Sequence, residues 1–440
     1  MARVSISGQN GNREKMEEQL LREIAGEYLL PLLSGATLLP KSRESSDQGK
    51  CVSITNSGTI EFKVDITDSY RLVIRRSWPF YEGTEFQIPS EKEVVDAFVA
   101  AIREIAPGLS EIYKQDLFSR FQRRLIAKAL ALALARHSEI GTASPEAILL
   151  DAIDQLDLWA TRLYEGKPIA AGLGFLEVDK EPTSATVSFD QICREDFSCV
   201  LSNGMDTLLA FDFQGRLRVW AGLPQSHNRS WAPYRLGPIA EWSDGADRVA
   251  LALDRLGEIL VFMQGRLVFA RRSGKWHFLI HNLMVEEPGR GEHVYSCLDA
   301  VYSSCLDASF ARTGACVGLV APEHRGDWKT LVPSKDDHLD AQRSVKTKAI
   351  KQMVGKRRFD GLDRRMQQEL LAIDGATLLD DAGHILAVGA IVKVPGGSTG
   401  GGRLAAAKEL SKLGLGIKVS QDGGIRGFRN GNSEEIFSVM

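Results

Sequence analysis

Residues 372–420 read AIDGATLLDDAGHILAVGAIVKVPGGSTGGGRLAAAKELSKLGLGIKVS. The apolar residues between Ala376 and Val394, interrupted by a turn at Asp381–Gly383, predict a pair of strands. A glycine-rich loop then leads into a predicted helix at Arg403–Leu413, and a further strand is predicted at Gly416–Ser420. Strands and helices in this order indicate an α/β fold, with a mixed sheet flanked by helices.

The residues upstream extend the same pattern. A helix is predicted at His293–Ala311, a short buried strand at GACVGLV (Gly314–Val320), and a second helix at Arg357–Leu371. We therefore predict one α/β domain over residues 286–440.

The N-terminal part has a different, α+β character. Ser90 and Glu93 have the spacing of a capping box and predict a helix start just before Val94. Residues 112–163 are helical in pattern, with a break near Gly141–Pro145. We predict a domain with a helical linker over residues 1–165, and its other expected elements are a helix at Glu14–Leu33, strands at 52–55, 59–66 and 70–75, and a helix at 94–105.

Residues 166–285 form a β-rich middle region in which two hairpins are predicted. One turns at Gly215 within LLAFDFQGRLRVWAG, and the other turns at Gly265 within ILVFMQGRLVFARR. Two such units at a blade-like interval are compatible with a β-propeller. Gln-Gly between apolar runs is also ordinary turn chemistry, so the two hairpins alone establish no repeat.

Composition excludes several classes of protein. The chain has 440 residues, 44% of them hydrophobic and 25% charged, with a formal net charge of −3, so it has no overall attraction to nucleic acid or to anionic membranes. The six cysteines form no CxxC pair and the N-terminus has no apolar signal core, which predicts a cytoplasmic protein. The most apolar helical run, Leu125–Leu134, is interrupted by Lys128 and is too short to cross a bilayer.

The loop Pro395–Gly402, PGGSTGGG, is the strongest candidate for binding a ligand. Its glycines let backbone N–H groups converge, and the following helix N-terminus favours an anion such as phosphate. A flexible surface loop is the simpler alternative. The loop is no Walker A motif, because Arg403 is followed by Leu404, and a dinucleotide fingerprint at Gly400, Gly402 and Ala405 has only 35 residues after it.

Asp374 is the second candidate. Its carboxylate lies at the start of an apolar strand, where it can bind a divalent metal or accept a proton from a ribose hydroxyl. Asp-Gly is also a common turn sequence, so the residue alone does not establish a site.

In combination, these features resemble the diadenylate cyclase family. The matching pieces are AIDGATLL (372–379), GGRLAAAKELS (401–411) and GIKVSQDGGI (416–425). The resemblance implies that two face-to-face copies each bind ATP with Mg²⁺ or Mn²⁺ and condense the two molecules into a cyclic dinucleotide. It also implies site roles for this chain: Asp374 and Arg403 in catalysis, Asp374 also on the metal, and Gly375, Ala376, Thr399, Gly400, Gly401, Gly402, Arg403 and Ser420 on the nucleotide.

The sequence departs from the family at one motif. Where the family has Arg-His-Arg, this chain has Arg403, Leu404 and Ala405, so one candidate metal ligand and one phosphate donor are missing. Two functions therefore stay open: a cyclase under the control of an N-terminal sensor, or an inactive domain that binds ATP or a cyclic nucleotide as a regulator.

Two further groups of residues have alternative interpretations. Seven basic residues between Arg343 and Arg358 occur without an acid among them, and they either steer a triphosphate or nucleic acid, or form a solvated helix face. His277 and His281 lie in WHFLIH, which has a strand pattern that would place both on one face, but no Cys or carboxylate partner is evident nearby. Nucleic acid is not indicated as a partner.

Overall fold

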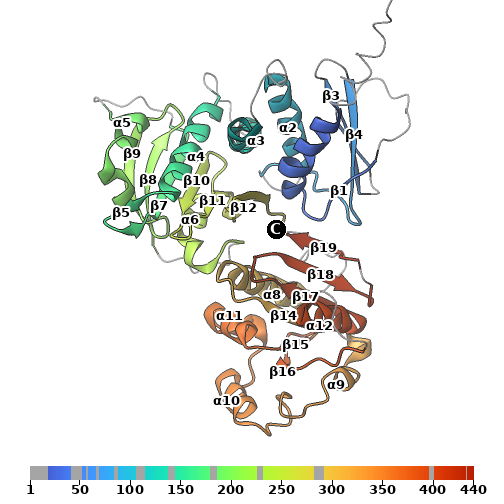
Figure 1. Cartoon of the computed structure of the whole chain (residues 1–440). Coiled ribbons are helices and arrows are strands. Elements are labelled where there is room, and N and C mark those ends of the chain that lie inside the picture. Colours follow the sequence, from blue (N-terminus) through green and yellow to red (C-terminus); the bar gives the residue numbers. More distant parts are fainter. Residues whose placement is uncertain are drawn as a thin grey trace, which may run out of the picture. The chain divides into compact units, whose positions relative to one another are not determined.

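The computed structural model describes residues 18–40, 52–55, 58–65, 69–83, 88–105, 114–136, 144–178, 186–224, 231–281, 292–395, 401–432 and 434–440. The chain divides into two compact units (Figure 1). Unit 1 comprises Met1–Ser226 and Pro238–Leu279, and unit 2 comprises His227–Gly237 and Ile280–Met440. The division of the chain into three functional domains, at 1–165, 166–285 and 286–440, stays a prediction.

Unit 1 begins with a four-stranded antiparallel sheet in the order β1-β4-β3-β2. The predicted strands are confirmed, as is the helix that follows them, and both hydrogen bonds of the Ser90–Glu93 capping box are present. The helix predicted at Glu14–Leu33 is helical from residue 18 onward, but it ends in a π-helical turn and a 3-10 turn that contains Pro31. Residues 14–17 lie outside the described residues. The strands are β1 Thr37–Leu38, β2 Val52–Thr55, β3 Thr59–Asp65 and β4 Ser69–Arg75.

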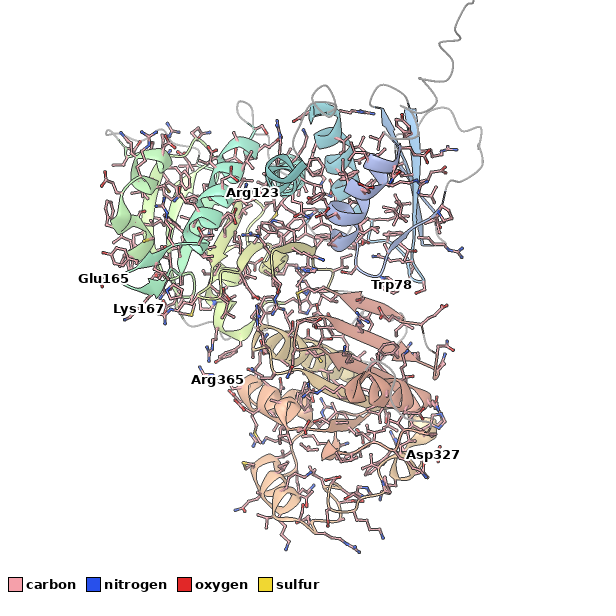
Figure 2. All side chains as sticks on the ribbon, viewed as in Figure 1. Trp78, Arg123, Glu165, Lys167, Asp327 and Arg365 are labelled. Atoms are coloured by element: carbon pink, nitrogen blue, oxygen red, sulfur yellow. The ribbon has the colours of Figure 1, made fainter. Side chains whose placement is uncertain are left out.

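A buried ion pair joins this sheet to helix α2 (Glu91–Ile105). Both side chains of the Arg76–Glu91 pair are fully inaccessible to solvent, and two Arg76 nitrogens donate to the carboxylate at 2.5 and 2.6 Å. The Arg76 guanidinium also lies over the ring of Trp78, which is labelled in Figure 2. Buried charges need such complete pairing, because an unpaired one costs several kcal/mol.

Two further helices follow, as the pattern predicts. They are α3 (Lys114–Ala135) and α4 (Glu146–Ala160). Arg123 of α3, labelled in Figure 2, donates to Asp157 of α4 at 2.6 Å. Phe98 of α2 packs edge to face against Phe121 of α3, so α3 contacts the helix on each side of it.

The second sheet of unit 1 has seven strands in the order β13-β12-β11-β10-β7-β8-β9, and only β7 and β8 are parallel. Both predicted hairpins are present, with turns at Gly215 and Gly265. They belong to this one sheet and are separated in it by β10 and β7, so the propeller interpretation is wrong for the described residues. The strands are β7 Ala171–Leu176, β8 Thr207–Asp212, β9 Leu217–Gly222, β10 Arg248–Leu253, β11 Ile259–Met263, β12 Arg266–Arg272 and β13 Lys275–Phe278.

Short elements complete this part of the chain. The pair β5 (Leu163–Tyr164) and β6 (Lys167–Pro168) forms a small hairpin. The short helices are α5 Phe189–Cys193, η4 Asp196–Val200, η5 Tyr234–Leu236 and α6 Gly237–Trp242.

Unit 2 is a mixed α/β fold, as predicted. Its six-stranded sheet has the order β16-β15-β14-β17-β18-β19, in which β14 and β15 are parallel and all other pairs are antiparallel. The strands are β14 Ala315–Val320, β15 Ala376–Asp380, β16 Ile385–Ala390, β17 Gly414–Val419, β18 Ile425–Arg429 and β19 Phe437–Val439. The helices are α8 Glu292–Phe310, η6 Pro322–His324, α9 Trp328–Leu331, α10 Val345–Val354, η7 Phe359–Gly361, α11 Arg364–Ala372, α12 Gly402–Leu410 and η8 Ser411–Leu413.

Helices cover both faces of this sheet. The Thr377 hydroxyl donates to the Leu370 carbonyl of α11 at 3.2 Å. Gly318 of β14 is the register partner of Leu378, the residue after Thr377 in β15. Gly318 faces α12, because a Cβ built on it would lie 3.1 Å from a Leu410 methyl carbon. Successive residues of a strand point to opposite faces, so α11 and α12 lie on opposite sides of the sheet.

Two predicted elements of unit 2 are wrong in part. Residues 357–371 are not one helix: a 3-10 turn at Phe359–Gly361 comes first, and Asp363 caps a separate helix by accepting from the Arg365 N–H at 2.9 Å. The predicted strand does not reach Val394. It ends at Ala390, and the Lys393 N–H donates to the Leu331 carbonyl at the end of α9 instead of to a neighbouring strand.

Within the ranges that the structure describes, no helix is both long and apolar enough to span a membrane.

Candidate functional site

Two glycines fix the position of Asp374 just before the start of β15. Gly375 has φ +108°, and a Cβ built on it would lie only 2.5 Å from the carbonyl carbon of Gly389. Gly389 has φ +59°, and a Cβ there would lie 3.0 Å from the Asp374 carbonyl oxygen. Because only glycine allows both conformations and such a close approach, the end of β16 fixes the backbone of Asp374.

The side chain of Asp374 projects into solvent. Its exposed fraction is 99%, and one carboxylate oxygen accepts from the Gly375 N–H at 3.1 Å. A carboxylate this exposed is open to a ligand.

The structure brings Arg403 next to Asp374. Nη2 of Arg403 lies 3.9 Å from Oδ1 of Asp374, and the arginine side chain is 33% exposed. The guanidinium extends over Gly314, where a Cβ would lie 2.6 Å from Nη1 and 3.2 Å from the Val419 carbonyl oxygen. An exposed pair at this distance contributes little stability, so both charges are available to a ligand.

Arg403 belongs to the first turn of α12, and no side chain among the described residues caps the N-terminus of this helix. Gly401 precedes the helix with φ +96° and provides no side-chain cap. The first helical hydrogen bond runs from the Ala405 N–H to the Gly401 carbonyl at 3.2 Å. The N–H groups of Gly402, Arg403 and Leu404 therefore have no helical acceptor, and together with the helix dipole they favour an anion.

The structure describes two of the four remaining predicted residues. Ala376 begins β15 and is buried, and its register partner is Ala390. Ser420 follows β17 in a turn, where its N–H donates to the Gly424 carbonyl at 2.8 Å. Thr399 and Gly400 lie outside the described residues, so their roles stay predictions.

Sequence inspection missed Lys418 and gave Lys346 only as one member of the basic run. Lys346 belongs to the basic run but is half-buried: its Nζ donates to Asp337 at 2.6 Å and to the Gly389 carbonyl at 3.1 Å. It thereby supports the strand end against which Gly375 packs. Lys418 of β17 lies opposite Cys316 of β14, and the Cys316 thiol lies 3.8 Å from the Arg403 carbonyl oxygen.

Burial shifts the pKa values of two groups near α12. It lowers the pKa of Lys418, Arg426 lowers it further, and Asp422 and Glu435 act in the opposite direction. Burial also raises the pKa of the Cys316 thiol to about 12, so this cysteine is a neutral, inert thiol.

The other basic residues and the histidine pair lie elsewhere. Five members of the basic run are exposed on or near α10, in agreement with a solvated face: Arg343, Lys348, Lys351, Lys356 and Arg357. The shared face predicted for the histidines is wrong, because β13 ends at Phe278, before His281. His277 belongs to unit 1, whereas His281 belongs to unit 2 and is hydrogen-bonded to Tyr302 at 2.7 Å. Among the described residues, no three His, Cys, Asp or Glu side chains gather into a metal site.

Comparisons with known proteins show weak structural similarity to solved structures. A crystal structure of a double mutant of DacA from Staphylococcus aureus is similar to 33% of this chain and to 90% of its own chain, with 14% sequence identity and a TM-score of 0.23. No protein-family model and no curated protein matches the chain. A similarity this weak supports no conclusion about function, which depends here on the residues of unit 2.

Proposed function

We propose that unit 2 binds a nucleoside triphosphate and acts as a nucleotidyltransferase that condenses two ATP molecules into a cyclic dinucleotide, as diadenylate cyclases do. One observation carries the proposal: the Asp374 carboxylate and the Arg403 guanidinium, far apart in the sequence, lie 3.9 Å apart beside an open helix N-terminus. Phosphoryl transfer to a hydroxyl group uses a carboxylate that accepts the hydroxyl proton and donors that hold the phosphate oxygens.

The binding step depends on Arg403 and on the N-terminus of α12. The backbone N–H groups of Gly402 and Arg403 and the arginine guanidinium hold phosphate oxygens, which charge-assisted hydrogen bonds favour. Gly401, together with Gly400 and Thr399, continues this cradle, and Ser420 reaches the terminal phosphate. Gly375 and Ala376 lie against the nucleoside.

A divalent cation fits the donor set. Asp374 supplies one exposed carboxylate, and no cluster of protein ligands is present among the described residues. Mg²⁺ is often held by one or two carboxylates together with substrate phosphates and water. Mg²⁺ or Mn²⁺ that arrives with the triphosphate would neutralise charge on the transferring phosphoryl group.

The chemical step needs two copies of the chain. The 3′-hydroxyl oxygen of one ATP bonds to the α-phosphorus of the other, the bond to pyrophosphate breaks, and Asp374 orients the hydroxyl and accepts its proton. A second round closes the ring and releases the second pyrophosphate. The almost complete exposure of Asp374 favours a face-to-face dimer, because each site is open to a facing copy. Unit 1 then serves as a sensor or regulatory module.

A second candidate function is binding without turnover. Leu404 and Ala405 follow Arg403 in α12 and offer no side-chain donor, so the site has fewer groups to stabilise a transition state than to bind a ground state. In this case the domain binds ATP or a cyclic nucleotide and reports it to unit 1.

One experiment separates these functions. Purified full-length protein is incubated with ATP and Mg²⁺ or Mn²⁺, and the products are separated by chromatography. A cyclic dinucleotide supports the cyclase, whereas thermal stabilisation by ATP without product supports the binding protein, since a ligand of the folded state raises its stability. Absence of both would refute the proposal.

The variant Asp374→Asn tests the proposed role of Asp374 as the group that accepts the hydroxyl proton. It is expected to lower turnover by about 10²- to 10⁴-fold while ATP still stabilises the protein, because the phosphate donors remain. Asp381→Asn is the matched control, since Asp381 lies at the far end of the same hairpin and pairs with Arg325. Full turnover in Asp374→Asn would remove Asp374 from the reaction.

A further inference from the structure

We propose that Lys418 is a phosphate-binding residue of the nucleotide site and supplies, together with Arg403, the positive charge that Leu404 and Ala405 do not provide. The inference rests on the proposed function and assigns a residue to it.

The strand register places Lys418 on the face that α12 covers. Lys418 is the register partner of Cys316 in β14 and of Arg426 in β18. Directly opposed residues of antiparallel strands project to the same face of a sheet. The Cys316 thiol lies 3.8 Å from the Arg403 carbonyl oxygen, so the Cys316 end of this row lies beneath the first turn of α12.

The Arg403 guanidinium extends to the same corner of the sheet. It lies over Gly314, next to the Val419 carbonyl oxygen, one residue beyond Lys418 in β17. Two cations from different elements, a helix turn and a strand, therefore belong to the region where β14 begins and β17 ends.

Within the part of the chain that the structure describes, Lys418 has no anionic partner that would explain its charge. No acid among these residues lies within ion-pair distance of its amine, whereas Arg426 is paired with Glu435 at 3.2 Å. Burial is the largest cause that disfavours its charged form, Arg426 adds to it, and the carboxylates Asp422 and Glu435 offset this only in part. An unpaired, half-buried cation is costly, and such residues are concentrated at functional sites.

Phosphate is the ligand chemistry that fits this pair. The lysine ammonium is a compact charge with three donors, and the arginine guanidinium supplies a planar fork for two oxygens. A polyanion that spans both groups and the N–H groups at the start of α12 would give Lys418 the anionic partner that it lacks within ion-pair distance. An uncharged nucleoside would gain nothing from Lys418.

The test is calorimetric titration of the full chain with ATP, with inorganic tripolyphosphate and with adenosine. Lys418→Met is expected to weaken ATP and tripolyphosphate binding by about 10- to 100-fold, as loss of one charge-assisted hydrogen bond predicts, with no change in any adenosine binding. Lys418→Arg should restore most of the affinity. Lys412→Met is the matched control, since Lys412 lies in the same unit and pairs with Glu409 at 2.7 Å.

The stability of the variant separates binding from folding. Because Lys418 is an unpaired cation beside two others, Lys418→Met should unfold at the same temperature as the parent protein or a higher one, even though it binds phosphate more weakly. Unchanged tripolyphosphate affinity in Lys418→Met would overturn the inference, while ATP binding by the parent protein would leave the proposed function intact. If the parent protein binds tripolyphosphate through Lys418 but does not bind ATP, the phosphate site stands and the nucleotide function fails.

Discussion

Gly375 positions Asp374, because a residue without a side chain is needed where the backbone passes so close to the end of β16. We expect Gly375→Ala to damage both stability and function. At φ +108° an L-residue is strained by about 1–2 kcal/mol. The new Cβ would also lie 2.5 Å from the carbonyl carbon and 2.8 Å from the next amide nitrogen of the Gly389–Ala390 peptide. Because both atoms are backbone, relief requires the end of β16 to move, which adds about 1–3 kcal/mol.

The assay is thermal unfolding with and without ATP. A loss of about 2–5 kcal/mol corresponds to a fall of roughly 5–15 °C in the melting temperature of a unit of this size. The displaced Asp374 should no longer lie beside Arg403, so cyclic dinucleotide formation should fall by at least about tenfold, since small misplacements are costly in catalysis.

Gly355→Ala is the matched control for backbone strain. Gly355 also has a positive φ, +65°, but no atom lies within 4 Å of the position of its Cβ. It should lose only the strain contribution of about 1–2 kcal/mol. If Gly375→Ala unfolds at the same temperature as Gly355→Ala and retains its turnover, the close approach of the two strand ends does not position Asp374.

Two further predictions concern buried charge. Asp307→Asn should destabilise unit 2 by about 3–5 kcal/mol in urea unfolding. In the parent protein the Arg364 guanidinium donates to the Asp307 carboxylate at 2.7 and 2.9 Å, and the variant leaves this guanidinium buried without its counter-ion. A loss of stability below about 1 kcal/mol, the value for an exposed pair, would contradict this prediction. Burial, with help from Arg272 and Lys275, lowers the pKa of His277 from 6.5 to about 4, so the unfolded chain binds a proton between these pH values and the folded chain does not. Stability is therefore complete above pH 6.5 and falls by about 2 kcal/mol on acidification to pH 5. His277→Gln should remove most of this pH dependence, and an unchanged pH profile of the unfolding free energy would refute the assignment.

Local patterns predicted most of the elements. The Ser90–Glu93 capping box and the turns at Gly215 and Gly265 are present as expected, because each depends only on residues a few positions apart. One prediction failed where a backbone N–H group donates to a carbonyl that lies far away in the sequence. The Lys393 N–H donates to the Leu331 carbonyl, so the expected strand stops short of Val394.

The sequence by itself determined the order of the elements, the mixed α/β character of unit 2, and the presence of an acid before one strand and an arginine at the start of a glycine-preceded helix. Only the tertiary structure decided that Asp374 and Arg403 are neighbours and that Lys418 lies opposite Cys316 on the face that α12 covers. The physical reason is the sequence separation of the residues that determine each feature. Periodicity and capping are encoded by adjacent residues, whereas strand register and the packing of α12 are set by contacts between segments that only the folded chain brings together.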